Sequence, residues 1–189
     1  MIRVLIPYNE DLTRVDLSGA SEFHTAYSLM NEEVEVALSG ASDFYGDLNA
    51  LSVRLDMSGA SGFFGDINGD GIDVSLSGAS NIEGKLTGIV LDLELSGASD
   101  AALMGQIAIL KIDLSGASDI IEKVVGNKYG LVCDQCEGKV SGGSAAYIHC
   151  DSSIEVSLSG GSELHYTGNA STTDSNTSGE SGIIHDVLP

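Results

Sequence analysis

The sequence predicts an all-β fold of the β-solenoid type, a single-stranded β-helix whose coils are about 19 residues long. The first observation is a repeat: a phrase close to Leu-Ser-Gly-Ala-Ser occurs nine times in 189 residues. The second is its spacing, since the copies lie 18 to 21 residues apart except for one gap of 26. Such a period is typical of architectures in which each repeat buries its apolar face by stacking on its neighbours. The central glycines are Gly19, Gly40, Gly59, Gly78, Gly97, Gly116, Gly142, Gly160 and Gly179.

The segment before each glycine predicts a strand. Apolar and polar residues alternate there, as in Ile72-Asp73-Val74-Ser75-Leu76, which is the period of a half-buried strand. Residues 21–30 hold the nearest approach to a helical period, and we interpret them as part of the first coil. The alternation recurs at Val34/Val36/Leu38, Val53/Leu55/Met57, Leu91/Leu93/Leu95, Leu110/Ile112/Leu114 and Ile154/Val156/Leu158.

Each repeat continues after its glycine with further inward positions, four and eight residues later. Nineteen residues are too few for a propeller blade, and no segment resembles the helix of a leucine-rich repeat. The remaining solution is one solenoid coil per repeat. The positions four residues after the glycine are Phe23, Phe44, Phe63, Ile82, Ala101, Ile120 and Leu164, and those eight after it are Leu48, Ile67, Leu86 and Val124.

The repeated phrase itself predicts a tight corner. Glycine adopts a positive φ without steric cost, and we expect the alanine after it to place its methyl group inside the bend. The serines on either side are expected to stack as ladders whose hydroxyls bond the coils above and below. Rows of serine indicate structure, because nucleophilic catalysis needs one activated serine.

Length and charge limit the classes of partner. We expect one domain, residues 1–189, with an irregular long coil at about 119–144 and a loose terminal coil at about 170–189. The net charge is −20, from 28 acidic and 8 basic residues, which argues against nucleic acid or an anionic membrane as partner. Charges largely alternate five residues before the glycine, and opposite charges on adjacent strands favour one register. This row is Arg14, Glu35, Arg54, Asp73, Asp92 and Lys111.

One outward position predicts a binding face. His24, Tyr45 and Phe64 lie five residues after a corner glycine, and Asp47 and Asp66 lie seven after it. Rings flanked by carboxylates suit a carbohydrate, and an exposed apolar patch also suits a protein partner. The alternative is a face that an upstream segment covers. On the following coils, the position five residues after the glycine carries no ring and is occupied by Glu83, Ala102 and Ile121.

The two aspartates also raise a catalytic alternative. Stacked on successive coils, Asp47 and Asp66 would lie about 5 Å apart, near the separation of the carboxylates in a retaining glycosidase. A polysaccharide lyase or glycoside hydrolase is therefore the rival hypothesis. Lys85 is the one basic residue near them, and a single positive charge gives little attraction for an acidic sugar.

The sequence favours no metal or other cofactor. Residues 66–71 mimic the start of a calcium loop, but the twelfth position is Ser77 where an EF-hand has glutamate. Cysteine and histidine are zinc ligands in type, yet the C-x-x-C pair Cys133/Cys136 has no second pair at the usual spacing. Cys133 and Cys150 fall nine and ten residues before their glycines, which predicts a disulfide between adjacent coils.

A family resemblance accompanies these patterns. The tandem Leu-Ser-Gly-Ala-Ser copies, the variants at 141–144 and 159–162, and the tail Ser162-Glu163-Leu164-His165-Tyr166-Thr167-Gly168-Asn169 resemble the auto-transporter adhesin, head GIN domain family over about residues 4–184. The resemblance implies a right-handed β-helix in a secreted or outer-membrane lipoprotein of Gram-negative bacteria, and it carries over no catalytic residues. It also implies a leader, a lipid anchor and a β segment upstream, with the junction near residues 4–8.

The sequence and the resemblance together suggest a non-enzymatic, adhesin-like module of the cell envelope or extracellular surface. Its expected partner is a glycan or a cell-surface protein, contacted through His24, Tyr45, Phe64, Asp47 and Asp66. A structural spacer is the third hypothesis, and assembly into a homo-oligomer stays open.

Overall fold

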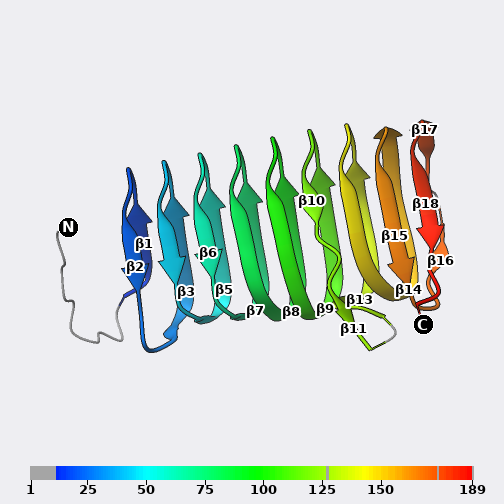
Figure 1. Ribbon diagram of the computed structural model, residues 1–189. Coiled ribbons are helices and arrows are strands. Elements are labelled where there is room, and N and C mark those ends of the chain that lie inside the picture. The colour runs from blue at the N-terminus through cyan, green and yellow to red at the C-terminus, as the bar shows by residue number, and fades with distance from the viewer. Residues whose placement is uncertain (1–11, 127, 174, 189) are drawn as a thin grey trace.

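The computed structural model describes residues 12–126, 128–173 and 175–188, and within them the chain is a β-solenoid of about nine coils without any helix (Figure 1). No described segment is therefore a helix that could cross a membrane. Residues 4–8, where the resemblance placed a junction, lie outside this range. The strands are β1 (Arg14–Leu17), β2 (Glu22–His24), β3 (Leu29–Leu38), β4 (Asp43–Tyr45), β5 (Leu48–Met57), β6 (Gly62–Phe64), β7 (Ile67–Leu76), β8 (Asn81–Leu95), β9 (Asp100–Leu114), β10 (Asp119–Ile120), β11 (Val124–Val125), β12 (Lys128–Tyr129), β13 (Leu131–Val140), β14 (Ala145–Gly160), β15 (Glu163–Thr167), β16 (Ser171–Thr172), β17 (Thr177–Gly179) and β18 (Gly182–His185).

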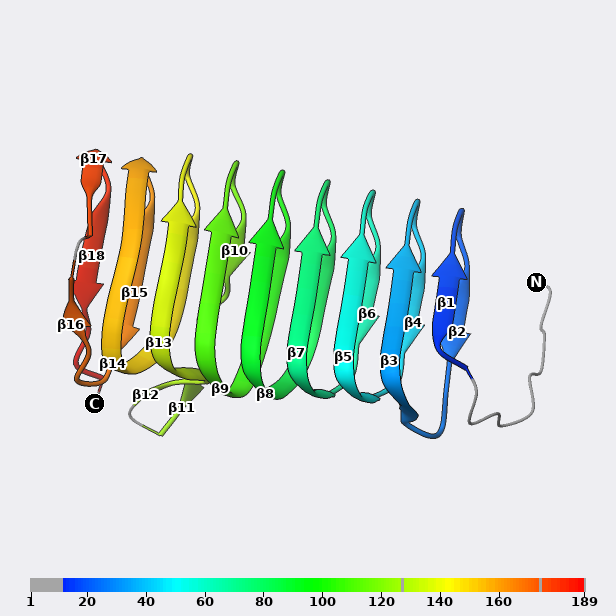
Figure 2. The ribbon, with the colours of Figure 1, turned by 180° about the vertical axis from the view of Figure 1, so that it is seen from behind.

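The coils stack in parallel with each residue over its counterpart one repeat away. Val36 pairs with Leu55, and Leu55 pairs with Val74. The long strands β1, β3, β5 and β7 form one face of the rod, and the short strands β2, β4 and β6 form the opposite face (Figure 2). The columnar interior that the period predicted is therefore confirmed.

The core is one column of apolar side chains along the rod. Phe44 and Phe63 are fully buried, and their rings stack with centroids 5.1 Å apart and planes 8° apart. Phe23 continues this stack at the N-terminal side and is half-buried. Residues 21–30 form β2 and the start of β3, as expected for part of a coil.

The corner glycines have φ between 76° and 82°. The prediction for the alanine beside them is wrong, because Ala41, Ala60 and Ala79 are exposed and the serine after each is buried. Ser80 closes its own turn by donating its hydroxyl to the Ser77 carbonyl at 2.8 Å. The Ser77 hydroxyl donates to the Met57 carbonyl of the preceding coil at 3.2 Å. The outer serine row therefore bonds the preceding coil, and the buried row closes its own turns and also bonds between coils, as where the Ser61 and Ser80 hydroxyls lie 3.2 Å apart.

The charged row stacks in the expected register. Arg14 contacts Glu35, Arg54 lies 3.5 Å from Asp73, and Lys111 lies 3.3 Å from Glu137. Exposed ion pairs contribute about 0–1 kcal/mol each. Their main effect is on register, since a slip by one residue would move the whole apolar set to the solvent face.

The long coil departs from the repeat by forming a hairpin. Seven residues more than the usual 19 leave the stack after β10 as the antiparallel pair β11–β12, and the chain rejoins it at β13. Val124, predicted to point inward, lies on β11 and is 50% exposed. Counting from Gly116 failed there because the extra residues lie outside the coil. In the terminal coil, β16 and β17 are short and exposed.

Candidate functional site

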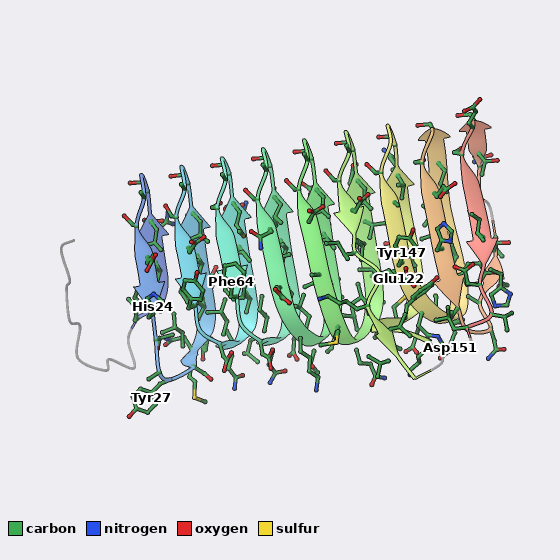
Figure 3. All side chains as sticks on the ribbon, in the orientation of Figure 1. His24, Tyr27, Phe64, Glu122, Tyr147 and Asp151 are labelled. Carbon is green, nitrogen blue, oxygen red and sulfur yellow. The ribbon has the colours of Figure 1, made fainter. Side chains whose placement is uncertain are left out.

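The three predicted rings form one continuous stack, which we call the ring column (His24, Tyr45 and Phe64). It lies on the face made by β2, β4 and β6, and Figure 3 labels its two ends. The ring centroids are 4.5 Å apart between His24 and Tyr45 and 5.0 Å apart between Tyr45 and Phe64, with planes within 12° of parallel. The His24 side chain is 61% exposed, and the other two rings are partly exposed.

The stacking decides how the ring column meets solvent. Both faces of Tyr45 are covered by neighbouring rings, so this residue offers its edge and hydroxyl to a ligand. Desolvation, and then the charges of Asp43 and Glu22, raise the pKa of Tyr45, so its phenol stays a neutral hydrogen-bond donor. His24 Nε2 lies 3.2 Å from Glu22 Oε2. The ring column thus presents apolar ring edges together with hydrogen-bond donors and acceptors.

The two aspartates of the predicted site form hydrogen bonds between adjacent coils. Asp47 Oδ1 accepts a hydrogen bond from the backbone N–H of Asp66 at 2.9 Å. Asp66 Oδ1 accepts one from the backbone N–H of Lys85 at 3.0 Å. Both side chains are exposed and lie beside the ring column, but each gives one carboxylate oxygen to the next coil. The arrangement is a ladder between coils.

The segment that mimicked a calcium loop is extended. Asn68 and Asp70 lie within strand β7, so their side chains do not converge as in a loop. The Asn68 side-chain amide lies 3.5 Å from that of Asn49 on the coil before. In the described parts of the chain, no group of three or more His, Cys, Asp or Glu side chains is arranged to hold a metal ion.

The outward position of the ring column carries rings again near the other end of the rod, which the sequence analysis did not identify. Tyr147 and His165 lie five residues after Gly142 and Gly160, and their rings stack with centroids 4.7 Å apart. Tyr129, on the hairpin, packs edge-on against Tyr147 at 5.5 Å. The signal was available by counting from the glycines beyond the long coil.

A hydrogen-bond network surrounds this second pair of rings. The Tyr129 hydroxyl donates to Asp186 Oδ2 at 2.5 Å, and His165 Nδ1 lies 2.9 Å from the same oxygen. The other ring nitrogen of His165 lies 3.1 Å from Glu163 Oε2. Burial, and then the bond to Asp186, raise the pKa of Tyr129. The network ties the hairpin to the terminal coil, so its task is structural.

This network predicts a pH dependence of stability. Burial lowers the pKa of His165, but the hydrogen bonds to Glu163 and Asp186 outweigh it, so the net shift is upward. Its contribution is therefore complete below the ordinary histidine pKa of about 6.5 and is lost as pH rises through the raised folded value. We expect the free energy of unfolding to fall by up to about 1 kcal/mol across this window. Urea denaturation at several pH values should show the fall in the natural sequence, and its persistence in His165→Gln would contradict the assignment.

The cysteines lie inside the stack. Cys133 and Cys150 are register partners on β13 and β14, as the spacing predicted, and Cys136 is also buried. All three are free thiols in the structure. The hydrogen bond with Cys150, and then burial, raise the pKa of Cys133, and burial raises the pKa of Cys136. Cys133 and Cys136 therefore stay protonated, whereas the hydrogen bond from Cys133 lowers the pKa of Cys150.

The disulfide stays a prediction that the register supports. Adjacent strands lie about 4.8 Å apart, within the range of about 4.4–6.8 Å between Cα atoms that a disulfide needs. We expect oxidation to join Cys133 to Cys150 and to raise the free energy of unfolding by about 3 kcal/mol, as for a loop of about 15 residues. Thiol titration of protein purified without reductant should find one free thiol, Cys136. Three free thiols, or stoichiometric zinc, would contradict the prediction.

Comparison with known proteins yields one match. Neither the curated proteins nor the solved structures contain a match to this chain. The family model described as "Putative auto-transporter adhesin, head GIN domain" matches residues 62–170, more than half of the chain. That name suggests an adhesin-like, non-enzymatic module at the cell surface. With the repeat, the corners and the parallel stack described above, the match shows that the chain belongs to the auto-transporter adhesin head GIN domain family.

Proposed function

We propose that this chain is a non-enzymatic adhesion module of the outer-membrane surface, and that it binds a glycan through the ring column. The observation that supports this proposal is the uninterrupted stack of three rings with its edge toward solvent. Mutual stacking fixes the rings in place, so little side-chain entropy is lost when a ligand contacts them. A prearranged rim on a rigid rod suits repeated weak contacts with a surface.

The chemistry of the column favours a neutral sugar. Tyr45 is a neutral donor, and the carboxylates of Glu22 and Asp43 beside it are acceptors for sugar hydroxyls. Since the ring faces are covered, contact is made by the apolar edges together with these polar groups. A net charge of −20 disfavours acidic polysaccharides.

The geometry gives less support to the enzyme alternative. A retaining glycosidase needs one carboxylate as nucleophile and one as acid. Asp47 and Asp66 are instead joined in a ladder, in which each accepts a backbone N–H from the following coil. Both are therefore better explained as coil-to-coil contacts.

A glycan array tests the proposal. The natural sequence should bind neutral glycans, and the double variant Tyr45→Ala/Phe64→Ala should lose at least 90% of the signal. Tyr27→Ala, at an exposed tyrosine outside the column, is the matched control and should keep it. Binding that survives in the double variant would remove the ring column as the contact surface. An array without any signal would favour the structural spacer.

A further inference from the structure

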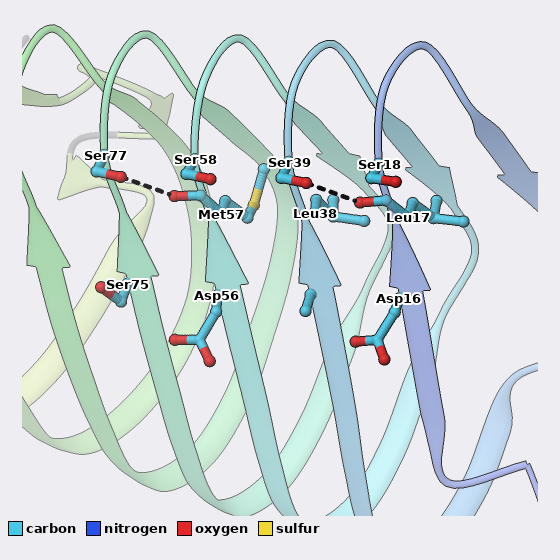
Figure 4. Close-up of a pocket in the computed structure, with 11 residues that line it drawn as sticks. Asp16, Leu17, Ser18, Leu38, Ser39, Asp56, Met57, Ser58, Ser75 and Ser77 are labelled. Atoms are coloured by element: carbon cyan, nitrogen blue, oxygen red, sulfur yellow. Dashed lines mark hydrogen bonds between the residues drawn. The ribbon is translucent and has the colours of Figure 1, made fainter.

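The opposite face of the rod carries a trough, which we define by the row Asp16, Ala37, Asp56 and Ser75 and the corner serines beside it. It crosses strands β1, β3, β5 and β7 (Figure 4). Its volume is about 450 Å³, within the range of about 300–1,000 Å³ typical of ligand sites. The ring column belongs to the other face (Figure 2), so the two surfaces are separate.

The hollow arises from an alternation of long and short side chains. Asp16, Ala37, Asp56 and Ser75 are successive register partners, three residues before their corner glycines. Ala37 and Ser75 leave space between and beside the two carboxylates. Since coils are about 4.8 Å apart, Asp16 and Asp56 lie about 10 Å from each other along the rod.

The serines along the trough differ in their hydrogen bonds. The Ser39 hydroxyl donates to the Leu17 carbonyl at 3.3 Å, and the Ser77 hydroxyl donates to the Met57 carbonyl at 3.2 Å. These two hydroxyls have used their hydrogen and offer lone pairs. No described residue bonds the hydroxyl of Ser58, which is exposed and therefore able to donate. The wall of the trough thus presents hydroxyl lone pairs at Ser39 and Ser77 and a hydroxyl donor at Ser58.

The carboxylates of the trough are held in fixed orientations by arginines. Arg14 Nε lies 2.8 Å from Asp16 Oδ2, and Arg54 binds both carboxylate oxygens of Asp56, at 2.9 and 3.4 Å. Each arginine also contacts a second carboxylate, Glu35 for Arg14 and Asp73 for Arg54, so the trough carboxylates are oriented acceptors that keep a net negative charge. This favours a ligand with neutral hydroxyls and disfavours an anionic one.

We infer that this trough is a second binding site, which takes an extended, neutral glycan chain lying along the rod. The chemistry required is a row of hydroxyls on a flat ribbon, because the strands beneath form a flat surface and the two oriented carboxylates lie two coils apart along it. Leu17 and Ala37 line it, are partly exposed and supply apolar contacts for the C–H groups of the sugar. The inference does not depend on the ring column.

The same groove has a second hollow farther along the rod. It has a volume of about 260 Å³ and lies between the same two rows, beside Ser141, Ser157 and Ser159. A polymer that follows the rod therefore meets both hollows. Two weak contacts on one chain raise the apparent affinity through effective concentration, so a long glucan should bind more tightly than a short one.

The test is a titration of the ¹⁵N-labelled protein with cellohexaose, followed by NMR. We expect amide shifts at Ala37, Asp56, Ser58 and Ser77 and none at Tyr45 or Phe64. Ala37→Leu fills the hollow and Asp56→Asn removes a charged acceptor with little change in size, and each should weaken binding at least tenfold. Ala102→Leu adds the same bulk on the opposite face and should bind normally, and circular dichroism checks that each variant folds.

The outcomes separate this inference from the proposed function. Loss of cellohexaose binding in Ala37→Leu and Asp56→Asn, with retention in Tyr45→Ala/Phe64→Ala, supports the trough. Loss in the ring variant alone would overturn the trough and leave the ring column as the glycan site. No shift on addition of cellohexaose, or shifts confined to the ring column, would also overturn it.

Discussion

Replacing Phe63 by alanine is expected to lower the free energy of unfolding by about 3–5 kcal/mol. The ring is fully buried and stacks on Phe44 at 5.1 Å in the middle of the core column. Coils above and below hold the backbone in register, so the space cannot collapse and a cavity remains. Urea denaturation, with the midpoint and slope compared with those of the natural sequence, measures the loss.

The next residue supplies the matched control. Phe64 has the same side chain on the same strand but points outward, where it stacks on Tyr45. Phe64→Ala should therefore cost only about 0.5–1.5 kcal/mol, the value of one aromatic pair. Equal losses in the two variants would contradict the columnar interior.

Alanine at Gly78 should have the second large effect. The residue has φ +80°, and an added Cβ would lie 2.5 Å from the backbone oxygen of Gly59 on the coil before. The left-handed conformation costs an L-residue about 1–2 kcal/mol, and the contact with backbone adds to it because the neighbouring corner cannot move alone. We expect a loss of more than about 2 kcal/mol in thermal or urea unfolding.

Gly71 is the control for this variant. It lies in strand β7, and a Cβ there would meet no heavy atom within 4 Å. Gly71→Ala should be neutral or raise the free energy of unfolding by about 0.4–1 kcal/mol, because alanine restricts the unfolded chain. A Gly78→Ala protein as stable as Gly71→Ala would show that the corners are not packed on one another.

Much of the fold was predictable because two simple periods coincide. The 19-residue period fixes which residues stack, and the two-residue alternation fixes which of them point inward, as for Val36, Leu55 and Val74. The expectation for the corner rested on side-chain size and was wrong. The two-residue alternation, counted back from the inward Ile82, gives Ser80 as inward and Ala79 as outward, as the structure has them.

The sequence predicted where the residues of the candidate site lie, but not which of their surfaces and atoms are free to contact a ligand. Counting from the glycine placed His24, Tyr45 and Phe64 in one outward row, yet it could not show that the rings cover each other's faces. The ladder made by Asp47 and Asp66 depends on side-chain rotation, which no period specifies. Tyr147 lies in the same row beyond an insertion, where the count has to restart.

The parallel stack also determines how this rod carries mechanical load. Strands β1 and β18 lie at opposite ends of the rod, so tension applied along its axis is carried in series by the boundaries between coils, and the weakest of them separates first (Figure 1). Each coil that peels away releases about 19 residues, or about 65 Å of extended chain. Because the hairpin and Asp186 bind the last coils together, yielding begins more easily at the β1 end. A rod built in this way would lengthen in steps when it is pulled.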